Sequence, residues 1–207
     1  MSRRKLKAIL TLCLLITSFL VWLDHTPACK ILPSGQKNSF RTHSSDYEKY
    51  NGETFTVINV VDGDTLDVDI PDGNHNSTRI RLWGVDTPET KSPKIQPMYF
   101  GREASEFTKK LTLGNQVTLY LEPQKTRGYY GRLLAYVQLP DKRFLNEALL
   151  TEGYSYAELR YPHSFYQKYS QLEAAARGQK KGLWQNVTRE QLPEWLKKKK
   201  PTLLKKK

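Results

Sequence analysis

The sequence is poor in cysteine and histidine, two residue types that often carry catalysis or hold metal ions. Its 207 residues contain two cysteines, Cys13 and Cys29, and four histidines without paired spacing. Both cysteines lie at or before the region where an export signal is processed, so we expect neither a disulfide nor a thiolate metal site in the folded domain. The histidine spacing gives no support to zinc chemistry or to a histidine general base. Any catalysis must therefore rest on acids and arginines.

Long apolar runs are also missing. The 16 uncharged residues 8–23 follow the basic stretch SRRKLK and end at Asp24. As a helix this run is roughly 24 Å long, which is shorter than the hydrocarbon core of about 30 Å. Residues 1–28 are therefore predicted to form a secretory signal peptide, and an uncleaved N-terminal membrane anchor is the alternative. In both cases the rest of the chain is expected to be exported.

Net positive charge is nearly absent from the middle of the chain. The net charge is +12, and the basic residues within 3–7, 197–200 and 205–207 account for 11 of it. Phosphate recognition between the two ends must therefore come from locally placed arginines and not from overall charge. A hydrophobic content of 38% in 207 residues is enough for one domain with appendages. One compact, monomeric domain is the expectation.

Composition divides the rest of the chain into three parts. Residues 29–51 are rich in Pro, Gly, Ser, Asn and charged residues without a period, which predicts a linker. Residues 52–187 are expected to form the domain. The lysine-rich tail, 188–207, is either solvated and disordered or attracted to nucleic acid or to anionic lipid.

Hydrophobic periodicity predicts five strands and three helices in the domain. We expect strands at 55–61, 64–70, 79–83, 117–122 and 132–139, and helices at 104–111, at 146–151 and from 164 to 178. Short strands interrupted once by a helix are typical of an OB-type barrel, whereas the alternating pattern of a doubly wound sheet is absent. The predicted fold is α+β: a five-stranded OB-fold β-barrel with three α-helices.

Acidic residues are concentrated at the ends of the first three predicted strands. Asp62 and Asp64 flank Gly63 at a turn, and Asp86 and Glu89 follow the strand that carries Arg81. Because consecutive strands are usually neighbours, these four acids are expected to converge. Their oxygen donors suit a hard cation such as Ca²⁺ or Mg²⁺. An ordinary hairpin turn at 62–64 and a surface ion pair at 79–89 are the structural alternatives.

A second arginine, Arg132, begins a later strand. Guanidinium groups match phosphate oxygens with paired hydrogen bonds in a way that lysine cannot. Two arginines, a cation held by acids and one further carboxylate are the groups needed to hydrolyse a phosphodiester. An outward-facing Arg132 paired with an acid is the alternative.

Five motifs in order resemble the staphylococcal nuclease (thermonuclease) family. They are VDGDT at 61–65, RLWGVDTPET at 81–90, GREASEFTKKL from 101, YYGRLLAY at 129–136 and LNEALLTEG from 145. The resemblance implies a Ca²⁺-dependent endonuclease on an OB-fold barrel that cleaves DNA and RNA and leaves 3′-phosphates. Matched position by position, it implies that Asp64, Asp86 and the Thr87 carbonyl bind calcium, with Asp62 in an outer shell. It further implies that Arg81 and Arg132 bind the phosphate and that Glu89 is the general base.

The sequence departs from the family pattern where the base should bind. Tyr129 stands where a lysine is usual, and the segment 154–161 is a residue short. Tyr130, Tyr156 and Tyr161 are candidates for stacking on a base, in single-stranded or locally unpaired nucleic acid. Two readings from other classes remain: a non-catalytic OB-fold module that binds nucleic acid or protein, and a membrane-tethered interaction protein.

Overall fold

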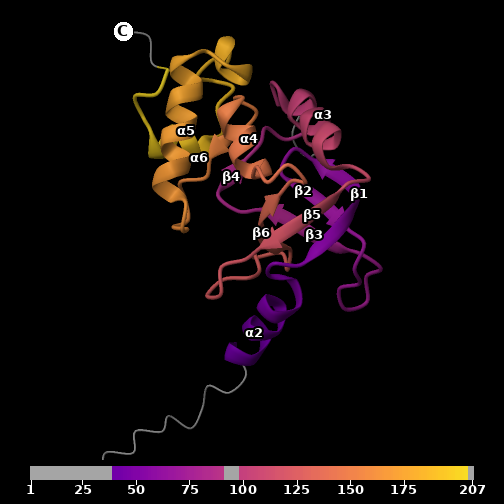
Figure 1. Cartoon of the computed structure of the whole chain (residues 1–207). Coiled ribbons are helices and arrows are strands. Elements are labelled where there is room, and N and C mark those ends of the chain that lie inside the picture. The colour runs from indigo at the N-terminus through magenta and orange to yellow at the C-terminus, as the bar shows by residue number, and fades with distance from the viewer. Residues whose placement is uncertain (1–38, 91–97, 205–207) are drawn as a thin grey trace, which may run out of the picture. The chain divides into compact units, whose positions relative to one another are not determined.

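The computed structural model describes residues 39–90 and 98–204 (Figure 1). Within these two ranges, no helix combines the length and the apolar character needed to cross a bilayer. Residues 1–28, for which the sequence predicts a signal peptide or anchor, lie outside the described residues.

Five strands close into a barrel in the order β1-β2-β3-β6-β5. Their bounds are β1 (Thr54–Asp62), β2 (Thr65–Val68), β3 (Thr78–Leu82), β5 (Gln116–Tyr120) and β6 (Leu133–Gln138). Neighbouring strands are antiparallel except β3 and β6, which run parallel. A separate two-stranded sheet pairs β4 (Val85–Asp86) with β7 (Tyr156–Ala157). The predicted α+β fold built on a five-stranded OB barrel is confirmed.

Alternation along β3 explains how the barrel presents charge on its outer surface. Ile80 and Leu82 are buried in the main core, whereas the alternating residues Arg79 and Arg81 point outward. Successive side chains of a strand face opposite sides, so burying the two aliphatic residues forces the arginines out of the barrel. The hydrophobic pattern of β3 therefore decides where Arg81 lies.

The three predicted helices are present as α3 (Gly101–Thr112), α4 (Leu145–Thr151) and α5 (Tyr166–Gly178). Helix α4 packs against β6, α3 and α5, and α5 also contacts β7 (Figure 1). Gly114, just beyond α3, has φ +76°, a left-handed conformation that favours glycine and ends the helix. The helices thus cover one part of the barrel and support the small β4–β7 sheet.

The predicted linker is wrong over residues 39–50, which form helix α2 (Ser39–Tyr50). Tyr50 is fully buried in the main core, and its hydroxyl lies 3.2 Å from Thr78 Oγ1. Arg127 Nε donates to Asp46 Oδ2 at 2.7 Å. The polar composition of this segment concealed these anchors, because each one depends on a partner far along the chain.

Of the two alternatives for the lysine-rich tail, the solvated and disordered one does not hold for residues 188–204. The 3₁₀ helix η1 (Gly182–Gln185) leads into helix α6 (Glu194–Lys199), and the chain stays packed on the domain. Leu192 and Leu196 are buried in a second apolar cluster with Leu183 and Trp184. The folded unit therefore extends well beyond residue 187, and residues 205–207 lie outside the described part of the chain.

Candidate active site

The turn at 62–64 joins β1 to β2 and packs tightly against the start of the loop after β4. The Asp64 amide donates to Asp62 Oδ1 at 3.2 Å, as expected of an aspartate that stabilises its own turn. A Cβ added at Gly63 would lie 2.8 Å from the Thr87 side chain, so only glycine fits here. The close approach holds the two acidic segments together, as the sequence predicts.

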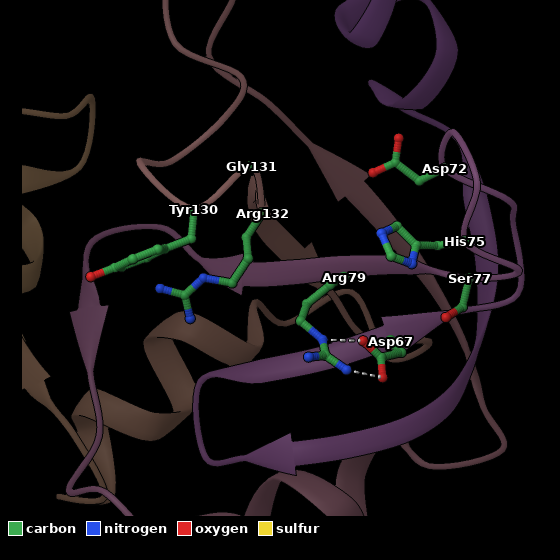
Figure 2. A pocket seen from close by; sticks show the side chains of 8 residues that line it. All are labelled: Asp67, Asp72, His75, Ser77, Arg79, Tyr130, Gly131 and Arg132. Atoms are coloured by element: carbon green, nitrogen blue, oxygen red, sulfur yellow. Dashed lines mark hydrogen bonds and ion pairs between the residues drawn. The ribbon is translucent and has the colours of Figure 1, made fainter. Parts of the chain in front are cut away.

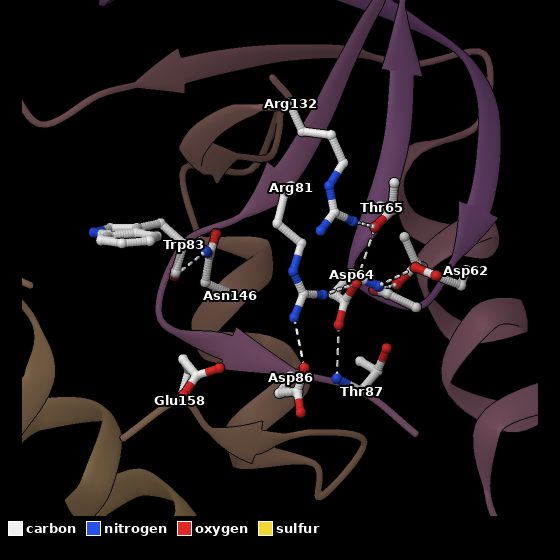
Figure 3. Close-up of polar contacts among 12 residues, drawn as sticks. Asp62, Asp64, Thr65, Arg81, Trp83, Asp86, Thr87, Arg132, Asn146 and Glu158 are labelled. Atoms are coloured by element: carbon white, nitrogen blue, oxygen red, sulfur yellow. Dashed lines mark hydrogen bonds and ion pairs between the residues drawn. The ribbon is translucent and has the colours of Figure 1, made fainter. Parts of the chain in front are cut away.

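Arg81 binds two carboxylates at once (Figure 3). Its Nη1 contacts Asp64 Oδ1, and its Nη2 donates to Asp86 Oδ1 at 2.6 Å. The Thr87 amide donates to the other oxygen of Asp64, Oδ2, at 2.8 Å. Asp64, Arg81, Asp86 and Thr87 therefore form one hydrogen-bonded group, in which a guanidinium neutralises two acids that would otherwise repel each other.

Arg132 lies beside Arg81 because β6 runs parallel to β3. The register pairs Arg81 with Leu134, so Arg132 stands just before the paired segment, and the two guanidinium groups lie side by side in Figure 3. Arg132 Nη1 donates to Thr65 Oγ1 at 3.4 Å, and no carboxylate of residues 39–90 or 98–204 lies within ion-pair distance of it. Burial and the positive charge of Arg81 lower the pKa of Arg132. The structure thus favours an Arg132 guanidinium that is available to bind an anion over one that is paired with an acid of the protein.

 Glu89 lines a cavity of about 700 Å³ together with Arg81 and Arg132. Although Glu89 is exposed, the protein removes enough water from its carboxyl to raise its pKa, and the negative charges of Asp62 and Asp86 raise it further. Burial also raises the pKa of Asp62, more than the nearby Arg81 lowers it. A carboxylate with a raised pKa is better suited to accept a proton.

The donor set fits a hard cation in its chemistry. Asp64 and Asp86 face one shared guanidinium, so their oxygens border a common space, and Asp62, Thr87 and Glu89 offer only further oxygen atoms nearby. Ca²⁺ and Mg²⁺ prefer such ligands and complete their shells with carbonyls and water. Across the described residues, no three acidic, histidine or cysteine side chains converge into a cluster that by itself could hold an ion.

The three candidate tyrosines separate into two groups. Tyr130 and Tyr161 are exposed and line a second cavity of 560 Å³, which also contains Arg81 and Arg132. Tyr161 stacks on Trp83 with ring centroids 6.4 Å apart. Tyr156 is 1% exposed, and its ring packs edge-on against Trp184. The structure therefore leaves Tyr130 and Tyr161 accessible to a base and argues against Tyr156.

A smaller opening of 360 Å³ shares Tyr130 and Arg132 with the 560 Å³ cavity (Figure 2). Arg79 lines it and binds Asp67 with two hydrogen bonds, of 2.8 and 3.1 Å. The alternative considered for Arg132 was an outward-facing strand arginine paired with an acid. In this opening Arg79 has that arrangement, and Arg132 does not.

Sequence reasoning missed two residues of the site, Trp195 and Arg160. Trp195 Nε1 donates to Asp86 Oδ2 at 2.7 Å, from 109 positions further along the chain. Arg160 binds Glu158 through both carboxylate oxygens, and its Nη2 lies 3.7 Å from Asp86 Oδ1. Arg160 could have been suspected from its place among tyrosines, but nothing in a lysine-rich segment marks Trp195.

Comparison with known proteins agrees with the motifs and the fold. Residues 79–186 match the family described as staphylococcal nuclease homologues. The chain is 40% identical to a thermonuclease of Staphylococcus hyicus over 144 residues, covering 69% of this chain and 82% of that protein. It is 37% identical to a thermonuclease of Staphylococcus intermedius over 147 residues, covering 70% and 83%. It is 34% identical to endonuclease YncB of Bacillus subtilis over 158 residues, covering 69% and 73%. The chain therefore belongs to the staphylococcal nuclease family.

Proposed function

We propose that this nuclease is a Ca²⁺-dependent endonuclease that hydrolyses phosphodiester bonds of DNA and RNA and leaves 3′-phosphates. The observation that carries the proposal is a single cavity lined by Arg81, Arg132 and Glu89 together with Asp64 and Asp86. These groups come from the turn between β1 and β2, from β3, from β4 and the loop after it, and from the residue just before β6. Family membership supports the nuclease activity, and the cavity supplies the groups that this activity requires.

The two arginines would bind the scissile phosphate. They lie side by side, Arg81 on β3 and Arg132 just before the parallel strand β6, and the described residues offer Arg132 no ion-pair partner. Charge builds up on the phosphoryl oxygens as a nucleophile approaches, and donors fixed in advance stabilise that charge without reorganising. Guanidinium groups suit this task because each can donate two parallel hydrogen bonds to phosphate oxygens.

Glu89 would be the general base. Its carboxylate accepts a proton from a water molecule while the water oxygen forms a bond to phosphorus. The bond between phosphorus and the 5′ oxygen then breaks, and this oxygen keeps the electron pair and takes up a proton from solvent. The products are a 3′-phosphate and a 5′-hydroxyl. The raised pKa of Glu89 and its position at the rim of the cavity support this role.

Asp64, Asp86 and the Thr87 carbonyl would hold Ca²⁺, with Asp62 in an outer shell. The bound ion supplies Lewis-acid polarisation of a phosphoryl oxygen. With an ion bound, Asp64 and Asp86 would be neutralised without Arg81, and the Arg81 guanidinium would be available to the phosphate. The hydrogen bond from the Thr87 amide to Asp64 supports a ligand set built from these two segments.

Tyr130 and Tyr161 would contact a base next to the scissile phosphate. Both are exposed in the 560 Å³ cavity that adjoins the two arginines. Stacking on aromatic side chains needs an unpaired base, so single-stranded or locally unpaired nucleic acid is the preferred substrate. We further propose that the protein acts as a monomer and is exported, either secreted or anchored through residues 1–28. Its basic ends would add attraction to nucleic acid or to anionic lipid.

The proposal is tested by incubating the full-length protein with labelled single-stranded DNA, duplex DNA and RNA, in CaCl₂ or in a chelator. We expect cleavage only with CaCl₂, faster on single strands, and products whose gel mobility changes after a phosphatase removes a 3′-phosphate. Cleavage that persists in the chelator would refute the calcium requirement. Binding of nucleic acid without cleavage under any condition would favour the non-catalytic OB-fold module.

A further inference from the structure

The Asp86 carboxylate is held by side chains from three separate parts of the chain. Trp195 Nε1 donates to Oδ2 at 2.7 Å, and Arg81 Nη2 donates to Oδ1 at 2.6 Å. Arg160 Nη2 lies 3.7 Å from Oδ1. Each oxygen of Asp86 thus faces a different donor, and the one that fixes Oδ2 comes from the C-terminal segment.

The C-terminal segment is well anchored around Trp195. The adjacent Leu196 is fully buried, and Leu192 is 2% exposed in the same apolar cluster. Lys200 Nζ donates at 2.9 Å to the buried Glu173 of α5. The Arg160 guanidinium lies 4.8 Å from the centre of the Trp195 ring, within the range of a cation–π contact. The indole is therefore held from both neighbouring turns and from one face.

This segment also forms one wall of the catalytic cavity. Residues 190–195 and Lys197 line the 700 Å³ space together with Arg81, Glu89 and Arg132. An indole N–H can only donate a hydrogen bond, so it fixes a carboxylate oxygen without competing for the role of ligand. Partners of this kind orient the groups that contact a metal ion, and removing one typically lowers metal affinity by about 10- to 100-fold.

We propose that Trp195 is a positioning residue, which fixes Asp86 through Oδ2 and so orients Oδ1 toward Arg81 and the cation site. The C-terminal segment is then part of the active site and not an appendage to it. This inference rests on the proposed function, because its readout is the affinity for Ca²⁺.

The test compares Trp195→Phe with Trp184→Phe in the full-length protein. Trp184 is a matched control: it lies in the apolar cluster against which Trp195 packs, the Arg177 guanidinium lies 5.4 Å from its ring, and its Nε1 has no hydrogen-bond partner among the described residues. We expect Trp195→Phe to raise the Ca²⁺ concentration for half-maximal cleavage and the Ca²⁺ dissociation constant from calorimetry, each by about 10- to 100-fold, with kcat at saturating Ca²⁺ nearly unchanged. Trp184→Phe should change neither constant.

A second measurement uses the unsubstituted protein. Its four tryptophans, labelled with 5-fluorotryptophan, should give fluorine NMR signals of which the Trp195 signal shifts on addition of CaCl₂. That signal is assigned from Trp195→Phe or, if this variant does not fold, by elimination with Phe variants of the other three. If the unsubstituted enzyme is Ca²⁺-dependent, two results overturn this inference and leave the proposed function intact. One is a Trp195 signal that does not shift when CaCl₂ is added, and the other is an unchanged Ca²⁺ dissociation constant in Trp195→Phe. A Ca²⁺-independent unsubstituted enzyme overturns the proposed function and this inference together.

Discussion

The Arg81 guanidinium donates from Nη2 to Asp86 Oδ1 at 2.6 Å, and its other terminal nitrogen contacts Asp64. One planar cation therefore connects the strand that carries it with both acidic segments of the site. A lysine, with a single ammonium group, cannot reproduce this double contact or the paired donation to a phosphate. The relationship makes Arg81 the residue on which the geometry of the site depends most.

Arg81→Lys should therefore lower kcat on single-stranded DNA by about 10²- to 10³-fold, the loss that follows removal of one fixed donor to a developing oxyanion. Steady-state kinetics measures the effect. Arg143→Lys is the matched control, since Arg143 also binds an acid, Asp141, through two nitrogens but does so far from the cavity. Equal kcat values for the two variants would contradict the role of Arg81.

Glu89→Gln should lower turnover by about 10²- to 10⁴-fold, because an amide cannot take a proton from water. Folding should be nearly unchanged, since Glu89 is exposed. Single-turnover cleavage and thermal unfolding measure the two effects. Glu106→Gln, an exposed acid on α3, should cleave at the normal rate. Normal turnover in Glu89→Gln would remove Glu89 from the mechanism.

Tyr161 and Tyr156 should respond differently to replacement by leucine. Tyr161→Leu removes an accessible ring from the 560 Å³ cavity and should weaken binding of single strands by about 1–3 kcal/mol, seen as a higher KM, with little effect on unfolding. Tyr156→Leu removes a buried ring and should mainly lower the free energy of unfolding. The opposite pattern would mean that Tyr156 and not Tyr161 contacts the base.

Acid should weaken the attachment of α2, because Arg127 binds both Asp46 of this helix and Asp72. Hydrogen bonds from Arg127, opposed in part by burial, hold the pKa of Asp72 below its ordinary value of 3.8. The unfolded chain then binds this proton more readily, so the stabilisation is complete above the ordinary pKa and is lost as pH falls through the lower, folded value. Urea unfolding at pH 6 should show Asp72→Asn to be less stable by about 1–2 kcal/mol, and the difference should shrink toward pH 3. A constant difference across this range would contradict the assignment.

Removing residues 188–207 should destabilise the domain. The truncation exposes the cluster that Leu192 and Leu196 help to fill, and burial of such a side chain contributes about 1.5–3 kcal/mol. We expect a loss of about 3–6 kcal/mol in urea unfolding. Removing only 205–207 is the control and should have no effect. Equal stability of both truncated proteins would restore the interpretation of the segment as a solvated tail.

Local patterns predicted most strands of the barrel, the outward direction of Arg81 and the meeting of the two acidic segments. The alternation of Ile80 and Leu82 with arginines predicted both the strand and the outward direction of Arg81, because side chains of a strand alternate strictly. The Asp62–Asp64 turn and the residues after β4 were expected to meet because consecutive strands are usually neighbours, and β2 does pair with β3. The structure departs from the predictions at residues 39–50 and 188–204, where the prediction rested on composition and not on periodicity.

The sequence by itself determined the fold class, the family and the residue types of the site, since each of these is encoded in short stretches of periodic or motif residues. Only the tertiary structure decided that Tyr50 and Leu196 belong to the folded unit, that Tyr156 is buried while Tyr161 is accessible, and that Trp195 binds Asp86. These outcomes depend on contacts between residues far apart in the chain. No local pattern records such a contact, because its free energy exists only once the barrel has brought the two partners together.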